Sequence, residues 1–357
     1  MSFRITPGRT TLRRTAAAAT AAGLALALAA CGSEDSSSSG GGDEGLGELD
    51  LQLSWIKNAE FAGEYMADSS GYFTDAGFSG VNLVAGPSTG VAELVQGSAK
   101  VALSDAVSIG TAVANEDAPV KIIGTTYQKN PFTVLSLADG GNIATPQDMI
   151  GKKIGVQDSN TSLFKALLAA NDIDEGELTI VPVQYDPSVL VNGEVDGFVS
   201  YLTNESITVQ AQGKAVTNLP FADNGLPFVA ETFVATDQTI AEDRDLLKAF
   251  LVAEIKGWTD VIEDPAAAVD VCLADYGADL GLVRDNEVKS AQIANDELIT
   301  SADTEENGLF TISEELQGET LESLAGAGID VTAEDLFDLS LLDEVYEENP
   351  DLVDYAG

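Results

Sequence analysis

A short run of aromatic and amide residues near position 55 is the part of the chain that best fits a small-molecule pocket. Trp55, Asn58 and Phe61 follow residues 51–54, whose alternation predicts a strand, and they lead into a segment whose apolar spacing predicts a helix. Aromatic rings offer flat faces to a planar ligand, and an asparagine amide can donate and accept hydrogen bonds at a ring edge. The pattern predicts one wall of a pocket, although ordinary core packing of these rings remains an alternative.

The chain contains no histidine. This removes the Ser-His-Asp and Cys-His nucleophile systems and every histidine-ligated metal site. A pair of carboxylates could still support hydrolysis, but no spacing in the sequence favours it. We therefore expect a binding protein with no catalytic residue, no metal site and no cofactor.

The start of the chain has the pattern of a lipoprotein export signal. Residues 1–30 combine four arginines with an apolar stretch that is too short to span a bilayer, and Leu-Ala-Ala-Cys at residues 28–31 looks like a lipobox. The pattern predicts lipidation of Cys31, with an accidental cysteine after an ordinary signal as the alternative. Residues 31–48 are rich in glycine, serine and acids, which predicts a flexible tether. Cys272 then has no disulfide partner, and its helical apolar surroundings predict burial.

The charge of the chain is strongly negative. Seventeen Lys+Arg against 59 Asp+Glu give a formal net charge of −42, and loss of residues 1–30 would leave 13 against 59, or −46. A surface of this sign repels nucleic acid, which excludes a nucleic-acid-binding role. Salty surroundings would screen the self-repulsion, so adaptation to salt is one interpretation.

About 310 residues remain after the tether. A single compact core does not usually hold so many residues, so this length predicts two lobes. Strand-like runs at residues 81–84, 101–103 and 120–126 alternate with helical patterns, as in a mostly parallel sheet covered by helices. Strand-like runs at 132–137 and 231–235 are the predicted crossings between lobes. The predicted first lobe is residues 49–134 and 235–357, including C-terminal helices, and the predicted second lobe is residues 135–234.

Two predicted helix starts could also contact a ligand. Ser88 and Asn160 each precede a helical pattern, where free backbone N–H groups are exposed. Capping of the helix is the alternative role for both residues.

Several motifs resemble, in order and spacing, the thiamine-pyrimidine (NMT1/THI5-like) solute-binding proteins of ABC importers, a branch of the SsuA/NrtA-like proteins. The resemblance covers most of residues 49–280. It rests on W-x-x-N-x-x-F-A-G-x-Y from Trp55, the small-residue turn at 86–89, Q-x-x-P from Gln128, D-x-x-G-K-x-I-G from Asp148, Y-x-x-N-E from Tyr201, and Gly257-Trp258 with Asp264-Pro265.

The resemblance implies a type II periplasmic-binding-protein fold, an α/β structure of two lobes joined by two crossings with the ligand in a cleft. It implies a monomer that is lipid-anchored at the extracytoplasmic face and delivers a small heteroaromatic, a thiamine pyrimidine precursor, to an ABC permease and its ATPase. The implied flat faces are Trp55, Phe61, Tyr127, Tyr185 and Tyr201. The implied polar contacts are Asn58, Gln128, Asn204, Glu205 and Glu231, with Glu231 facing an exocyclic amine.

Other cargoes remain open at this point. Val229 stands where the family often has a tyrosine, and its smaller side chain could widen the pocket for riboflavin. Nitrate or a sulfonate would need cations near the site, where the sequence offers little beyond Lys57 and Lys129. A pyrimidine-forming enzyme of the kind found among fungal relatives would need a histidine. Glu205 could tether the structure rather than contact ligand.

Overall fold

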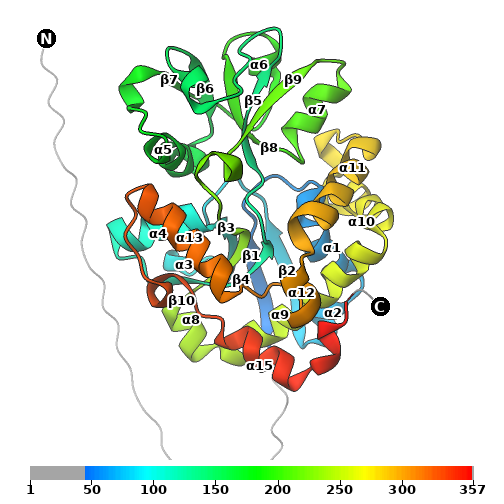
Figure 1. The fold of residues 1–357 in the computed structure, drawn as a ribbon. Coiled ribbons are helices and arrows are strands. Elements are labelled where there is room, and N and C mark those ends of the chain that lie inside the picture. The colour runs from blue at the N-terminus through cyan, green and yellow to red at the C-terminus, as the bar shows by residue number, and fades with distance from the viewer. Residues whose placement is uncertain (1–44, 356–357) are drawn as a thin grey trace, which may run out of the picture. The chain divides into compact units, whose positions relative to one another are not determined.

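The computed structural model describes residues 45–355, which form two lobes, each built around a five-stranded mixed sheet (Figure 1). The predicted signal segment, Cys31 and nearly all of the predicted tether lie outside the described residues. No helix within residues 45–355 combines the length and the apolar character needed to cross a bilayer.

The first lobe contains the sheet formed by the first four strands of the described chain and the last one. In order across the sheet, its strands are β2 (Phe78–Val84), β1 (Gly47–Gln52), β3 (Val101–Asp105), β10 (Ala230–Thr236) and β4 (Val120–Tyr127). Strand β1 is parallel to β2 and β3, whereas β10 is antiparallel to β3 and β4. The three predicted strands at 81–84, 101–103 and 120–126 are confirmed as β2, β3 and β4.

The second lobe repeats this plan. Its strand order is β7 (Thr179–Pro182), β6 (Lys153–Val156), β8 (Gly197–Tyr201), β5 (Phe132–Leu137) and β9 (Val216–Pro220). Strand β6 is parallel to β7 and β8, and β5 is antiparallel to β8 and β9. In each sheet the antiparallel strand is the one that arrives from the other lobe, so each sheet is mixed rather than mostly parallel.

The two connections between the lobes lie a few residues away from the predicted crossings. Strands β4 and β5 are joined by residues 128–131, and β9 and β10 by residues 221–229. The predicted boundaries at 134/135 and 234/235 therefore fall inside strands that each belong to one sheet. The strand-like character of these runs comes from their burial inside a sheet, between two hydrogen-bonded neighbours, and not from the crossing itself.

Helices cover the sheets and add a long C-terminal region. The helices between strands are α1 (Ala62–Ser69), α2 (Tyr72–Asp75), α3 (Val91–Gln96) and α4 (Ala106–Glu116) in the first lobe, and α5 (Thr161–Ala170), α6 (Ser188–Val191) and α7 (Glu205–Ala211) in the second. The C-terminal helices are α8 (Asp237–Glu242), α9 (Arg244–Glu263), α10 (Pro265–Val271), α11 (Arg284–Ala294), α12 (Ala302–Asn307), α13 (Glu314–Gly326), α14 (Ala333–Leu336) and α15 (Ser340–Glu348). Helix α13 contacts α4 and α5, and α11 contacts α7, so this region touches both lobes.

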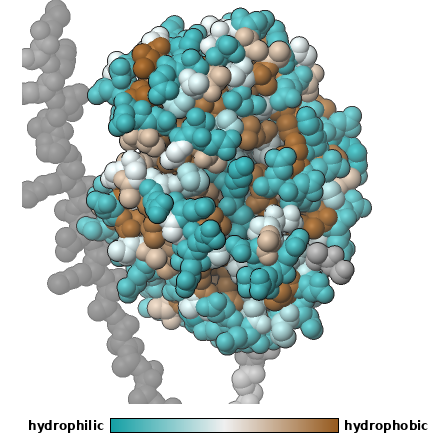
Figure 2. Space-filling model, in the orientation of Figure 1, coloured by the Kyte–Doolittle hydropathy of each residue, from teal (hydrophilic) through white to brown (hydrophobic). Residues whose placement is uncertain are grey.

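Local chemistry accounts for several of these elements. Asp105 caps α4 and Pro265 occupies the first position of α10, both as predicted. Helix α9 packs on α1 at Gly257, where an added Cβ would lie 2.3 Å from the carbonyl oxygen of Gly63. Cys272 is fully buried with a free thiol, as predicted. Figure 2 shows a mostly hydrophilic face, in keeping with the high charge of the chain.

Candidate ligand cavity

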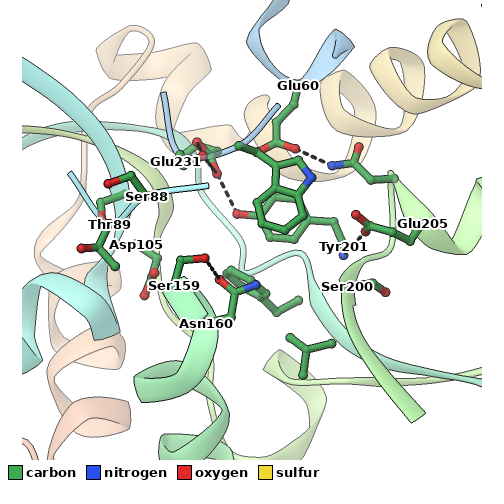
Figure 3. Close-up of a pocket in the computed structure, with 16 residues that line it drawn as sticks. Glu60, Ser88, Thr89, Asp105, Ser159, Asn160, Ser200, Tyr201, Glu205 and Glu231 are labelled. Atoms are coloured by element: carbon green, nitrogen blue, oxygen red, sulfur yellow. Dashed lines mark hydrogen bonds between the residues drawn. The ribbon is translucent and has the colours of Figure 1, made fainter. Parts of the chain in front are cut away.

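A cavity of about 460 Å³, including the open space at its mouth, lies between the two lobes (Figure 3). First-lobe residues that line it are Ser54, Trp55, Glu60, Ser88, Thr89, Ser104, Asp105 and Glu231. Residues that line it from the second lobe are Phe132, Ser159, Asn160, Val199, Ser200, Tyr201, Asn204 and Glu205.

The cavity forms where strands of both sheets end. Trp55 follows the end of β1, Asp105 ends β3, Asn160 follows β6, and Tyr201 ends β8. Since these strands are parallel within each sheet, their carboxyl ends share one edge, and the loops that follow them converge. The topology therefore brings together Trp55 and Tyr201, which lie 146 positions apart in the sequence.

Glu231 reaches the cavity because of a bulge in β10. Its neighbours Ala230 and Thr232 pair with β3, but the register shifts between them and Glu231 has φ +46°. A bulge turns a side chain away from the direction that regular alternation would give it. The buried carboxylate then accepts hydrogen bonds from Ser54 Oγ, 2.9 Å away, and from Tyr201 Oη, 2.6 Å away. Glu231 thus links the first lobe to Tyr201 of the second.

Glu60 lies beside Glu231 and was not predicted as a site residue. It belongs to the short 3₁₀ helix η1 (Ala59–Phe61), whose start is fixed by Asn58 Oδ1 accepting from the Glu60 N–H at 3.1 Å. One Glu60 carboxyl oxygen accepts from the Asn204 amide of the second lobe, and the other has no hydrogen-bond partner. Glu60 is one of two acids, with Glu64, in the motif that runs from Trp55 to Tyr65, and this is the signal that could have identified it.

The pKa values of the Glu60 and Glu231 carboxyls are both raised. Burial, and next the charge of Glu231, raise the pKa of Glu60 well above its ordinary value. Burial raises the pKa of Glu231 to about 7, against hydrogen bonds from Tyr201 and Ser54 that favour its charged form. Because burial and mutual repulsion both favour protonation, the two carboxyls titrate as a coupled pair that carries less negative charge than two free glutamates.

Asp105 occupies a position where many cavities bind anions. Its carboxylate accepts from the backbone N–H groups of Val107 and Ser108, both at 2.9 Å, and from Ser108 Oγ at 2.6 Å. These are the free N–H groups of the first turn of α4, which otherwise attract a negative ligand. Among the described residues that line the cavity there is no lysine or arginine.

Seven predicted site residues line the cavity, and five do not. Trp55, Ser88, Asn160, Tyr201, Asn204, Glu205 and Glu231 are brought together there. The carboxyl of Glu205 accepts from the Tyr201 backbone N–H at 3.1 Å. Burial raises the pKa of Glu205 to about 7, although the hydrogen bond from the Tyr201 backbone N–H favours its charged form. Glu205 therefore fixes the start of α7 to the end of β8 as well as lining the cavity.

The other five predicted residues have positions outside the cavity. Asn58 caps η1 and Phe61 is fully buried behind it. The ring of Tyr127 is buried with its centroid 6.4 Å from that of Tyr201, so it supports the ring that does line the cavity. The Gln128 amide donates to the Thr311 carbonyl at 3.0 Å. Tyr185 is 41% exposed on the surface.

Buried polar atoms in the cavity wall have no partner within the described protein. They are one carboxyl oxygen of Glu60 and the hydroxyls of Ser104 and Ser200. Burying such groups without hydrogen bonds is costly, so a ligand that pairs with them gains free energy. No group of acidic, cysteine or histidine side chains within residues 45–355 is arranged to hold a metal ion.

Comparisons with known proteins place the chain in a family. The profile described as NMT1/THI5 like matches residues 58–268. The chain is 26% identical over 304 residues to the riboflavin-binding protein RibY of Chloroflexus aurantiacus, covering 80% of this chain and 82% of that protein. It is 25% identical over 259 residues to the formylaminopyrimidine-binding protein of Halalkalibacterium halodurans, covering 70% and 78%.

A solved structure extends the likeness to the fold. The periplasmic nitrate-binding protein NrtA of Synechocystis superposes with a TM-score of 0.61 at 14% identity, covering 86% of this chain and 90% of that one. The predicted two-lobed periplasmic-binding-protein fold is confirmed by this likeness together with the two sheets and their strand order. With more than half of its length matched by the family profile, the chain belongs to the NMT1/THI5-like family.

Proposed function

We propose that the protein is the extracytoplasmic substrate-binding component of an ABC importer and that it captures a small planar nitrogen heteroaromatic of the thiamine-pyrimidine precursor type. The observation that carries the proposal is the pairing, in one cavity, of aromatic rings from Trp55 and Tyr201 with two adjacent carboxyls. Rings stack on a planar ligand, and carboxyls accept from its amine and ring N–H groups. The relative from Halalkalibacterium halodurans, named for binding a formylaminopyrimidine, supports this class of ligand.

Delivery would follow from the two-lobed arrangement. Tyr201 and Asn204 of the second lobe donate to Glu231 and Glu60 of the first, so the cavity residues themselves connect the lobes. A ligand that contacts both lobes favours the conformation in which they are held together. We propose that an ABC permease with its ATPase recognises this form, and that a monomer anchored through lipidated Cys31 presents it at the extracytoplasmic face of the membrane.

Riboflavin is the second candidate ligand. It is favoured by the relative from Chloroflexus aurantiacus, which is named for riboflavin binding and is matched over a larger share of this chain. The suggestion that Val229 widens the pocket has no support in the geometry, because Val229 is fully buried and does not line the cavity. Nitrate and sulfonates are disfavoured by a lining of four carboxyls without a cation. Catalysis is not part of the proposal, since the chain has no histidine to serve as the base of a Ser-His-Asp or Cys-His nucleophile system.

Calorimetric titration of the purified protein with 4-amino-5-hydroxymethyl-2-methylpyrimidine, its formylaminomethyl relative and riboflavin tests the proposal. We expect one of these to bind in the micromolar range or tighter. Trp55→Ala and Glu231→Gln should each weaken binding at least tenfold, which is about 1.4 kcal/mol, without unfolding the protein. Tyr185→Ala, which removes an exposed aromatic outside the cavity, is the matched control and should bind normally. Absence of binding to all three compounds would refute the proposal.

A further inference from the structure

The charge of the cavity constrains the ligand beyond its shape. Four acids, Glu60, Asp105, Glu205 and Glu231, are each at least nine-tenths buried in its wall, and no described lining residue carries a positive charge. Carboxyl groups in such a site are stabilised by hydrogen-bond donors, not by further acceptors. Asp105 and Glu231 accept from protein donors at both oxygens, and Glu205 accepts at one oxygen from a backbone N–H. Glu60 differs because one of its oxygens is buried without any hydrogen-bond partner.

Glu60 and Glu231 form the part of the cavity that is incomplete without a ligand. One Glu60 oxygen is buried, lines the cavity and has no partner, as do the hydroxyls of Ser104 and Ser200. The acids nearest the pair are Asp105 from β3, Glu205 from α7 and Glu64 from α1, and the phenols of Tyr127 and Tyr201 also face it. None of these neighbours supplies a positive charge that could balance an anionic ligand.

Two acidic side chains of the protein also use backbone N–H groups that could otherwise bind an anionic ligand. Asp105 takes the first-turn N–H groups of α4, and Glu205 takes the backbone N–H of Tyr201. These backbone N–H groups lie at strand ends in the cavity wall, where a phosphate or sulfonate oxygen would have to bind. Their use by the protein's own carboxylates leaves a negative ligand with fewer donors and more repulsion.

We propose that Glu60 and Glu231 act together as a charge filter that admits a neutral or cationic planar ligand with N–H donors and rejects its phosphorylated form. This inference rests on the proposed function and assigns Glu60 as a specificity-determining residue of the same site. One edge of the ligand donates to the free Glu60 oxygen and to Glu231. A phosphate group on the same compound brings negative charge close to the pair and finds no cation in the wall.

The test uses two matched pairs of compounds that differ only in a phosphate ester. They are 4-amino-5-hydroxymethyl-2-methylpyrimidine with its monophosphate, and riboflavin with flavin mononucleotide. Calorimetric titration at pH 7.5 gives the affinity ratio within each pair. For the wild-type protein we expect the unphosphorylated member of one pair to bind at least a hundredfold more tightly than its phosphate ester.

The double variant Glu60→Gln with Glu231→Gln removes the charge of the pair and should reduce that ratio to tenfold or less. Glu48→Gln alone and Glu48→Gln with Glu194→Gln, at exposed acids outside the cavity, remove one and two negative charges. These controls bracket the charge change at the pair and should leave the ratio unchanged. Circular dichroism checks that both double variants fold. If the variant with Glu60→Gln and Glu231→Gln does not fold, the affinity ratio is measured for the single variant Glu60→Gln instead.

The outcomes separate the two proposals. If neither unphosphorylated compound binds the wild-type protein, the proposed function fails and the filter fails with it. If both members of a pair bind within tenfold of each other, the filter alone is refuted. A ratio that stays above a hundredfold in the folded Glu60→Gln, Glu231→Gln variant would show that discrimination arises elsewhere, and would overturn the assignment to these carboxyls.

Discussion

Replacing Glu64 by glutamine should stabilise the protein, and by much more at pH 8 than at pH 5. Glu64 lies on α1 with no exposed surface, and neither of its carboxyl oxygens has a hydrogen-bond partner. Glu254 on α9 is buried in the same way, and the indole N–H of Trp258 approaches Glu64 without the alignment of a hydrogen bond. Burial raises the pKa of Glu64 from 4.5 to about 8.

The sign of the pH dependence of stability follows from the proton that the folded protein keeps on Glu64. Between pH 4.5 and about 8 the folded protein keeps a proton on Glu64 that the unfolded chain has lost. Stability is therefore fullest below pH 4.5 and falls as the pH rises towards 8. At 1.36 kcal/mol per pKa unit the loss is about 0.7 kcal/mol at pH 5 and roughly 4 kcal/mol at pH 8. Glutamine has nearly the same shape and no proton to lose, so the variant should recover these amounts.

Urea unfolding at pH 5 and pH 8 measures the effect directly. We expect the free energy of unfolding of Glu64→Gln to exceed that of the wild type by less than about 1 kcal/mol at pH 5 and by several kcal/mol at pH 8. Glu48→Gln, an exposed acid on β1, is the control and should show no such pH dependence. An equal change at both pH values, or a loss of stability at pH 8, would refute the reasoning.

Two further predictions concern ligand affinity and salt. Because the pKa of Glu231 is raised to about 7, its carboxylate becomes protonated at lower pH and can no longer accept from an N–H group of the ligand. The affinity measured by calorimetry should therefore fall about tenfold per pH unit below 7. An affinity that stays constant from pH 5.5 to 8.5 would contradict this. The formal charge of −42 should make the protein self-repelling at low ionic strength, so its melting temperature should rise by about 5 °C or more between 0.05 and 1 M NaCl. A melting temperature independent of salt would show that repulsion among the acidic side chains does not destabilise the fold.

Local sequence signals identified most strands of the fold, but they placed the two connections between the lobes a few residues away from where they lie. Strand-like runs at 132–137 and 231–235 were visible because burial within a sheet leaves a strong apolar pattern. The same pattern could not reveal that β5 and β10 each lie wholly in one sheet, since this depends on which strands they pair with. Asp105 and Pro265 were identifiable because capping is a short-range property.

The candidate site was predictable where a residue follows a strand and not where its direction depends on distant packing. Trp55 and Tyr201 lie at strand ends, so their place in the cavity followed from the motif positions. Gln128 turns away because the C-terminal segment offers it the Thr311 carbonyl, a partner 183 positions away. Glu60 faces the cavity only because Asn58 fixes the start of η1, a geometry that residue types alone do not express.

The central claim is that rings and carboxyls of the two lobes hold a planar nitrogen heterocycle between them. A crystal structure of the protein with the tightest-binding compound of the calorimetric panel tests it most directly. We predict the ligand ring against Trp55 or Tyr201, with an N–H group within 3.2 Å of a carboxyl oxygen of Glu60 or Glu231. A ligand bound at another surface, or one in the cavity whose acceptor edge faces these carboxyls, would contradict the account.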